Sequence, residues 1–215
     1  MTFNTVKFFD ALANHLVNRS DDVRALAVMA AMEHWIQFEA AALVDRNRKA
    51  LGIGGVRNED GTPAYWVACE PSKVDLWIEG DDEALAIEFK VVHNNKNLYT
   101  KVSELRRDLA TSKAVPNTEV PVRRVGVILS VCVQYMPPYG RRYPVLRASP
   151  KDAALADEEF EAEVVKALAD SDPWYQGRAS LSVVKGPAEI ADLRQAHYVD
   201  KSKGGAVKLW LVGSA

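Results

Sequence analysis

Three charged residues in the middle of the chain have types and a spacing that could support chemistry: Asp75, Glu88 and Lys90. Residues 74–79 and 84–92 have strand character, and a Gly-Asp-Asp turn signal separates them. Because side chains alternate along a strand, Glu88 and Lys90 share one face. Because a short turn pairs the start of the first strand with the end of the second, we expect Asp75 to lie close to both.

Two carboxylates held close together repel one another, so such a pair needs a compensating cation. Oxygen ligands of this kind suit Mg²⁺, for which Mn²⁺ is the natural substitute. A lysine beside them can orient and help to deprotonate an attacking water and can stabilise charge developing on a phosphate. These are the parts that phosphodiester hydrolysis requires. The alternative is that the Glu-x-Lys pattern marks the solvated face of an ordinary strand.

The elements around these residues predict a mixed α/β fold in the order helix, three strands, helix, strand. An Ala- and Leu-rich segment predicts one long helix that the glycines after residue 51 would end. A nearly continuous apolar run is typical of a buried central strand. The expected helices span residues 3–17, 23–51 and 99–113, and the expected strands span residues 64–69, 74–79, 84–92 and 124–133.

The C-terminal third, from residue 134, is expected to extend this core within a single domain of residues 1–215. It begins with a loop rich in Pro, Tyr and Arg. Its composition then predicts an acidic helix over residues 153–169 and strands over residues 180–185 and 206–212. The core itself is expected to occupy residues 23–133.

Two strand segments and the helix after them, Lys73–Ile78, Ile87–Val91 and Lys101–Asp108, resemble the core of the PD-(D/E)XK, or restriction-endonuclease-like, nucleases. The resemblance covers roughly residues 23–133 and implies a mixed central sheet with an αβββαβ core. We expect long N-terminal helices and a C-terminal α+β extension to complete the fold. The family's proline before the first aspartate is replaced here by Val74, as it is in many members.

The resemblance also implies a role for each residue of the motif. Asp75 and Glu88 would bind the metal, the main-chain carbonyl of Phe89 would add a ligand, and Lys90 would be catalytic. On this basis we expect a Mg²⁺-dependent DNA endonuclease of restriction, defence or repair type. The alternative is a catalytically inactive nuclease fold that serves as a nucleic-acid-binding or assembly module.

Members of this family often carry a further glutamate on the helix before the sheet, where it supports the metal or the water. Glu39 and Glu33 are the two candidates. Apolar residues surround Glu39 at helical spacing, and a carboxylate in an apolar face is costly unless it is used or paired. We therefore prefer Glu39, with Glu33 left open. The alternative for Glu39 is pairing with a basic residue such as Arg46.

Charge is distributed unevenly along a chain whose formal net charge is −2. Ten basic and three acidic residues lie between residues 91 and 147, whereas residues 152–172 hold eight acidic residues and one basic. A basic face can bind phosphates even when total charge is near zero. Lys101, Arg141 and Arg142 are the candidate nucleic-acid contacts, and solvated surface residues are the alternative.

Composition excludes several other classes. The chain is 48% hydrophobic and 26% charged, which is typical of a soluble globular protein. It lacks an apolar run of the roughly 20 residues that a membrane helix needs. The two cysteines, Cys69 and Cys132, are expected to be reduced thiols in a cytoplasmic protein. Nucleic acid, with DNA favoured, is the expected partner, and the oligomeric state stays open, a homodimer included.

Overall fold

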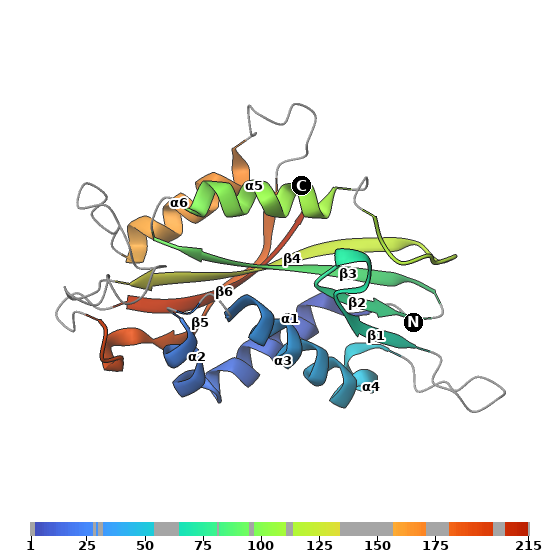
Figure 1. Ribbon diagram of the computed structural model, residues 1–215, viewed down its shortest axis with the longest axis horizontal. Helices are drawn as coiled ribbons and strands as arrows, with labels where there is room; N and C mark the ends of the chain where they lie inside the picture. Colours follow the sequence, from blue (N-terminus) through green and yellow to red (C-terminus); the bar gives the residue numbers. More distant parts are fainter. Residues whose placement is uncertain are drawn as a thin grey trace.

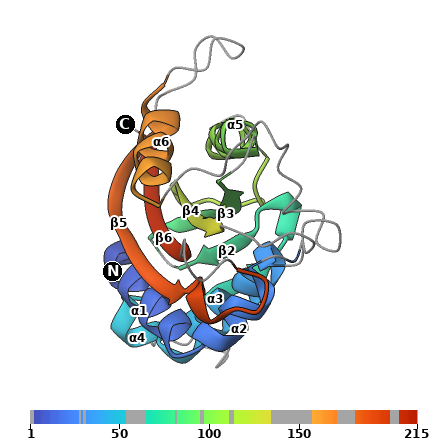
Figure 2. The same ribbon diagram turned by 90° about the vertical axis from the view of Figure 1, so that its left-hand side faces the viewer.

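The computed structural model describes residues 3–27, 29, 32–53, 65–80, 82–94, 97–110, 114–133, 157–170, 181–199 and 205–214. These residues form three layers, with a mixed β-sheet between two layers of helices (Figure 1). The helices are α1 (Thr5–Val17), α2 (Ser20–Leu26), α3 (Met32–Arg46), α4 (Arg48–Leu51), α5 (Asn97–Leu109) and α6 (Asp157–Ala169). The strands are β1 (Trp66–Cys69), β2 (Leu76–Glu79), β3 (Ala84–His93), β4 (Val122–Val133), β5 (Leu181–Asp192) and β6 (Gly205–Ser214). Helices α5 and α6 cover one face of the sheet, and α1 to α4 cover the other (Figures 1 and 2).

The six strands are ordered β1-β2-β3-β4-β6-β5. β3 and β4 are parallel and are connected through α5, whereas every other neighbouring pair is antiparallel. The expected mixed α/β class is thus confirmed. The C-terminal third adds β6 and β5 to the same sheet, and β5 curves along its edge from α6 to α1 and α2 (Figure 2).

β3 lies in the interior of the sheet and is buried along its whole length. Its alternation divides the two faces as expected. Leu85, Ile87, Phe89 and Val91 join the main apolar core against α1 to α4. Lys90 reaches α5 on the opposite face, where it meets Asp108. The strand therefore carries its charged residues into the layer between the sheet and α5.

The single long helix expected over residues 23–51 is wrong, because α2, α3 and α4 occupy this region. Past Leu26 the N–H of Met29 donates to the Leu26 carbonyl at 2.8 Å, which is a tight i+3 bond instead of the helical i+4 bond. The carbonyl of Ala27 then accepts a hydrogen bond from the Nε2 of His93 on β3, at 3.0 Å. Helix propensity does not reveal this break, because it carries no information about tertiary contacts such as this one.

The other expected elements are present with shifted ends. α1 begins at Thr5, where the side chain of Asn4 accepts from the N–H of Lys7 at 2.8 Å and so caps the helix. β5 extends to Asp192, well beyond the expected strand, through several register irregularities against β6. No helix in the described part of the chain is both long and apolar enough to cross a bilayer.

Burial of His93 predicts a pH dependence of stability. Burial lowers the pKa of His93 below the usual 6.5, although the hydrogen bond to the Ala27 carbonyl opposes this shift. The unfolded chain therefore takes up a proton below pH 6.5 that the folded chain refuses. As the pH is lowered below 6.5, we expect the free energy of unfolding to decrease, by at most about 1.4 kcal/mol per pH unit from this residue. Urea unfolding between pH 5 and 8, approximate limits set by where histidine titrates, measures the slope. Equal slopes for wild type and His93→Gln would contradict the prediction.

Gly126 on β4 allows close packing of α5 against the sheet. A methyl group at this position would meet Leu105 Cδ2 on α5 at 2.9 Å and Val212 Cγ2 at 2.7 Å. We expect Gly126→Ala to lower the free energy of unfolding by about 1–3 kcal/mol through overpacking. Gly80→Ala is the matched control, because its nearest neighbour would be the Glu83 carbonyl at 3.9 Å. Urea unfolding midpoints of the two variants should differ, and equal midpoints would argue against a tight contact.

Candidate active site

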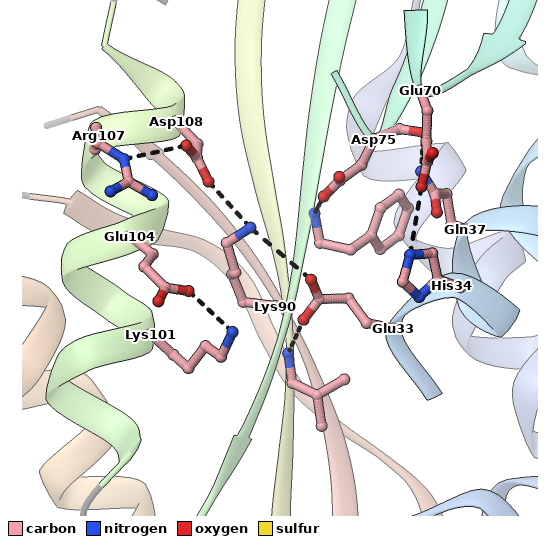
Figure 3. A network of polar contacts seen from close by, with 12 residues as sticks. Glu33, His34, Gln37, Glu70, Asp75, Lys90, Lys101, Glu104, Arg107 and Asp108 are labelled. Atoms are coloured by element: carbon pink, nitrogen blue, oxygen red, sulfur yellow. Dashed lines mark hydrogen bonds and ion pairs between the residues drawn. The ribbon is translucent and has the colours of Figure 1, made fainter. Parts of the chain in front are cut away.

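Two carboxylates bind the edge of β3 at the point where β2 leaves it. The pairing between these strands ends at Leu76 and Ile87. Beyond that point the N–H of Phe89 donates to Asp75 Oδ2 at 2.7 Å, and the N–H of Val91 donates to Glu33 Oε2 at 3.2 Å (Figure 3). Side chains from the β1–β2 connection and from α3 thus take over the positions that a longer β2 would fill.

A tight turn places Asp75. Glu70, Ser72 and Lys73 have φ values of 57°, 52° and 67°, in the left-handed region that costs non-glycine residues about 1–2 kcal/mol each. The turn brings the N–H of Glu70 to 3.2 Å from the Asp75 carbonyl. The amide of Gln37 on α3 donates to the same carbonyl. Backbone strain of this kind is concentrated at functional sites in proteins, so the turn supports a role for Asp75.

Lys90 lies between α3 and α5 and is 6% exposed. Its Nζ is 3.0 Å from Asp108 Oδ2 and 4.0 Å from Glu33 Oε1 (Figure 3). Burial opposes the charge of Lys90, but the carboxylates of Asp75, Glu33 and Asp108 together outweigh it and raise the pKa of the ammonium group. Lys90 is therefore a cation at neutral pH, and carboxylates from α3, α5 and the β1–β2 connection surround it.

Glu88 is 1% exposed, so neither it nor Lys90 lies on a solvated strand face. Its register partner on β4 is Gly126, and Arg124 precedes Gly126 by two residues on the same face. Burial lowers the pKa of Arg124, and the negative charge of Glu88 opposes that shift. A buried carboxylate is costly unless it is paired or binds a cation, and here Arg124 supplies a nearby positive charge.

The structure places Glu33, and not Glu39, in contact with β3. Glu39 Oε2 is 2.6 Å from His15 Nε2, and Glu39 Oε1 is 2.9 Å from Arg19 Nη1. Glu39 is therefore paired with basic residues, as the alternative predicted, but these are His15 and Arg19 instead of Arg46. Helical spacing alone does not tell which face of α3 turns towards β3, so the sequence could not separate the two glutamates.

The candidate nucleic-acid contacts remain predictions. Lys101 lies on α5 near the site, where its Nζ is 2.9 Å from Glu104 Oε2 (Figure 3). Arg141 and Arg142 lie outside the described residues. The basic segment before them also supplies structural contacts, since Arg106 is buried and donates to the Leu168 carbonyl of α6 at 2.9 Å.

Sequence reasoning missed two residues that shape the site. Gln37 is 2% exposed and lies one helical turn after Glu33, so both reach the sheet from one face of α3. Asp108 is the acidic partner of Lys90 on α5. The sequence places Asp108 beside Leu109, at the margin of an apolar helical stripe. A residue at that margin faces the neighbouring strand, where a buried lysine needs a counter-ion.

The donors at this edge fit a hard divalent cation. No three His, Cys, Asp or Glu side chains in the described ranges are grouped as metal ligands. Mg²⁺, however, commonly uses one or two carboxylates together with water and substrate phosphate. Asp75 and Glu33 supply two carboxylates. The Phe89 carbonyl faces the same edge as its N–H, because the two groups of one residue point to the same side of a strand.

Comparisons with protein-family models, with curated proteins and with solved structures found no match for this chain.

Proposed function

We propose that this protein is a Mg²⁺-dependent nuclease that hydrolyses phosphodiester bonds, and that it acts as a DNA endonuclease of restriction, defence or repair type. The observation that carries the proposal is the burial of Lys90 among the carboxylates of Asp75, Glu33 and Asp108. Three negative charges around one positive charge leave an excess that a divalent cation would balance. A purely structural ion pair would need one carboxylate.

The order of elements supports a restriction-endonuclease-like core. α3 precedes an antiparallel run of β1, β2 and β3, and α5 then connects β3 to the parallel strand β4. An αβββαβ order of this kind is what the proposed core would have. The acidic residues lie where β2 departs from β3, which leaves main-chain groups of β3 open to side chains from two other elements.

Each residue has a proposed role in the reaction. Asp75, Glu33 and the Phe89 carbonyl would hold the cation at the edge of β3, and Glu88 is a further predicted ligand whose charge Arg124 balances in the metal-free protein. When bound, Mg²⁺ supplies a Lewis acid for the phosphate and lowers the pKa of a coordinated water. Lys90 would orient the attacking water and stabilise negative charge as it develops on the phosphate.

Nuclease activity is tested by incubating the full chain with supercoiled plasmid, linear duplex, single-stranded DNA and RNA, each with Mg²⁺, with Mn²⁺ or with EDTA. We expect cleavage of DNA that requires the metal and that includes closed circular plasmid, because an endonuclease needs no free end. Nucleic-acid binding without cleavage under every metal condition would favour the inactive binding module. Asp75→Asn protein purified in parallel controls for contaminating nucleases.

The two glutamates of α3 provide a direct test of the site. We expect Glu33→Gln to reduce the single-turnover rate by about 10²-fold, because the loss of a placed active-site group typically costs that much. Glu39→Gln should instead weaken the pairing with His15 and Arg19 and act on stability. Single-turnover cleavage and the unfolding midpoint are measured on both variants. Slower cleavage by Glu39→Gln than by Glu33→Gln would instead favour Glu39 as the glutamate that supports the site.

A further inference from the structure

Asp108 lies outside the predicted ligand set, yet it is the carboxylate closest to Lys90 among the contacts described above. Its Oδ2 is 3.0 Å from Lys90 Nζ, and its side chain is 13% exposed. It approaches from α5, whereas Glu33 approaches the same ammonium group from α3, on the opposite side (Figure 3). The second oxygen of Asp108, Oδ1, is 3.6 Å from Arg107 Nε.

The Lys90 ammonium group and a divalent cation would compete for the carboxylates of the site. An ammonium group and a divalent cation repel one another, and both are attracted to the same carboxylates. Lys90 Nζ already lies 4.0 Å from Glu33 Oε1 and interacts electrostatically with Asp75. A lysine ammonium on its flexible stem would approach these two carboxylates more closely if nothing held it elsewhere.

We propose that Asp108 is a positioning residue that holds the Lys90 ammonium on the α5 side of the site, so that Glu33 and Asp75 can bind a divalent cation. The inference rests on the proposed function, since it assumes that a metal binds there. Asp108 is well placed for this role, because α5 is anchored by Leu105 and Leu109, which are buried against the sheet. The rigid helix fixes the carboxylate, and the carboxylate fixes the lysine.

The test is a double-mutant cycle in Mn²⁺ affinity, measured by calorimetry on the full chain without nucleic acid. The four proteins are wild type, Asp108→Asn, Lys90→Met and the double variant. Without Asp108, Lys90 turns to Glu33 and Asp75 and opposes the metal. We expect Asp108→Asn to weaken Mn²⁺ binding by about tenfold, the effect of one unit charge acting through a partly shielded site. In the Lys90→Met background the same substitution should have no effect, because the competing cation is absent.

Three other results would overturn this inference. Equal weakening in both backgrounds would make Asp108 a metal ligand and overturn the positioning role. An unchanged affinity in the presence of Lys90 would overturn it as well and leave Asp108 a structural partner. Wild-type protein that binds no Mn²⁺ would instead overturn the proposed function, and this inference with it.

Two further variants control the cycle. Glu104→Gln removes a negative charge one turn earlier on α5, where Glu104 pairs with Lys101. We expect Glu104→Gln to leave Mn²⁺ affinity unchanged. A tenfold loss of affinity in this variant would mean that Asp108 acts only through its negative charge and not through its contact with Lys90, which would overturn the proposal. Asp108→Glu retains the carboxylate and should restore most of the affinity that Asp108→Asn loses. Failure of this rescue, with an unchanged unfolding midpoint, would count against the proposal.

Discussion

Asp75→Asn is expected to lower the rate of metal-dependent cleavage by about 10³-fold or more, since a bound metal contributes several kcal/mol of transition-state stabilisation and each 1.36 kcal/mol is tenfold in rate. The substitution removes the negative charge that would bind the cation. It retains an oxygen that can still accept from the N–H of Phe89, which Asp75 now does at 2.7 Å. The fold should therefore persist, and the loss should appear in chemistry and in metal affinity.

Asp22→Asn is the matched control for this variant. Asp22 is an exposed aspartate on α2 that pairs with Arg19, and its loss should leave cleavage unchanged. Single-turnover rates, Mn²⁺ titration and circular dichroism on both variants separate a site effect from a folding effect. Cleavage by Asp75→Asn at the wild-type rate would rule out Asp75 as a metal ligand.

Lys90→Met is expected to slow single-turnover cleavage by about 10² to 10⁴-fold, the range for losing a positioned catalytic group. Methionine retains much of the apolar stem, so the buried site stays filled where the shorter alanine would leave a cavity. Mn²⁺ should bind at least as tightly as in wild type, because Asp75 and Glu33 keep their charges and lose a competing ammonium. The variant should therefore bind metal and substrate while failing in the chemical step.

The control for Lys90→Met is Lys166→Met, which removes an exposed lysine that pairs with Glu163 on α6. Its cleavage rate and substrate affinity should match wild type. Substrate affinity measured in Ca²⁺ or EDTA completes the comparison for Lys90→Met. A loss of affinity proportional to the loss of rate would make Lys90 a binding residue, and an unchanged rate would remove it from the reaction.

Local pattern was sufficient to predict the strands of the core. The alternation within residues 84–92 assigned Glu88 and Lys90 to one face of β3 and Phe89 to the other, and the structure has this arrangement. The long apolar run that became β4 indicated a strand covered on both faces. Strand periodicity depends only on neighbouring residues along the strand, so it can be predicted without knowledge of the tertiary structure.

Helices carried less information about the site. The propensities of residues 23–51 favour helix throughout, yet α2 ends at Leu26, and the Ala27 carbonyl accepts a hydrogen bond from His93, which is far away in the sequence. Periodicity defines an apolar stripe on a helix, but it does not say which polar neighbour of that stripe meets the sheet. Glu33 and Glu39 were therefore hard to separate until α3 was placed against β3.

The sequence by itself determined that Glu88 and Lys90 share one face of a buried strand and that Asp75 lies close to the start of the neighbouring strand, because side chains alternate along a strand and a short turn joins the two strands. Only the tertiary structure decided which other charges join them. Glu33 arrives on α3 from one side of β3, Asp108 arrives on α5 from the other, and Arg124 lies beside Glu88 through the parallel pairing of β3 with β4. These partners come from separate elements, and their meeting depends on how helices pack across a sheet, which no local spacing encodes.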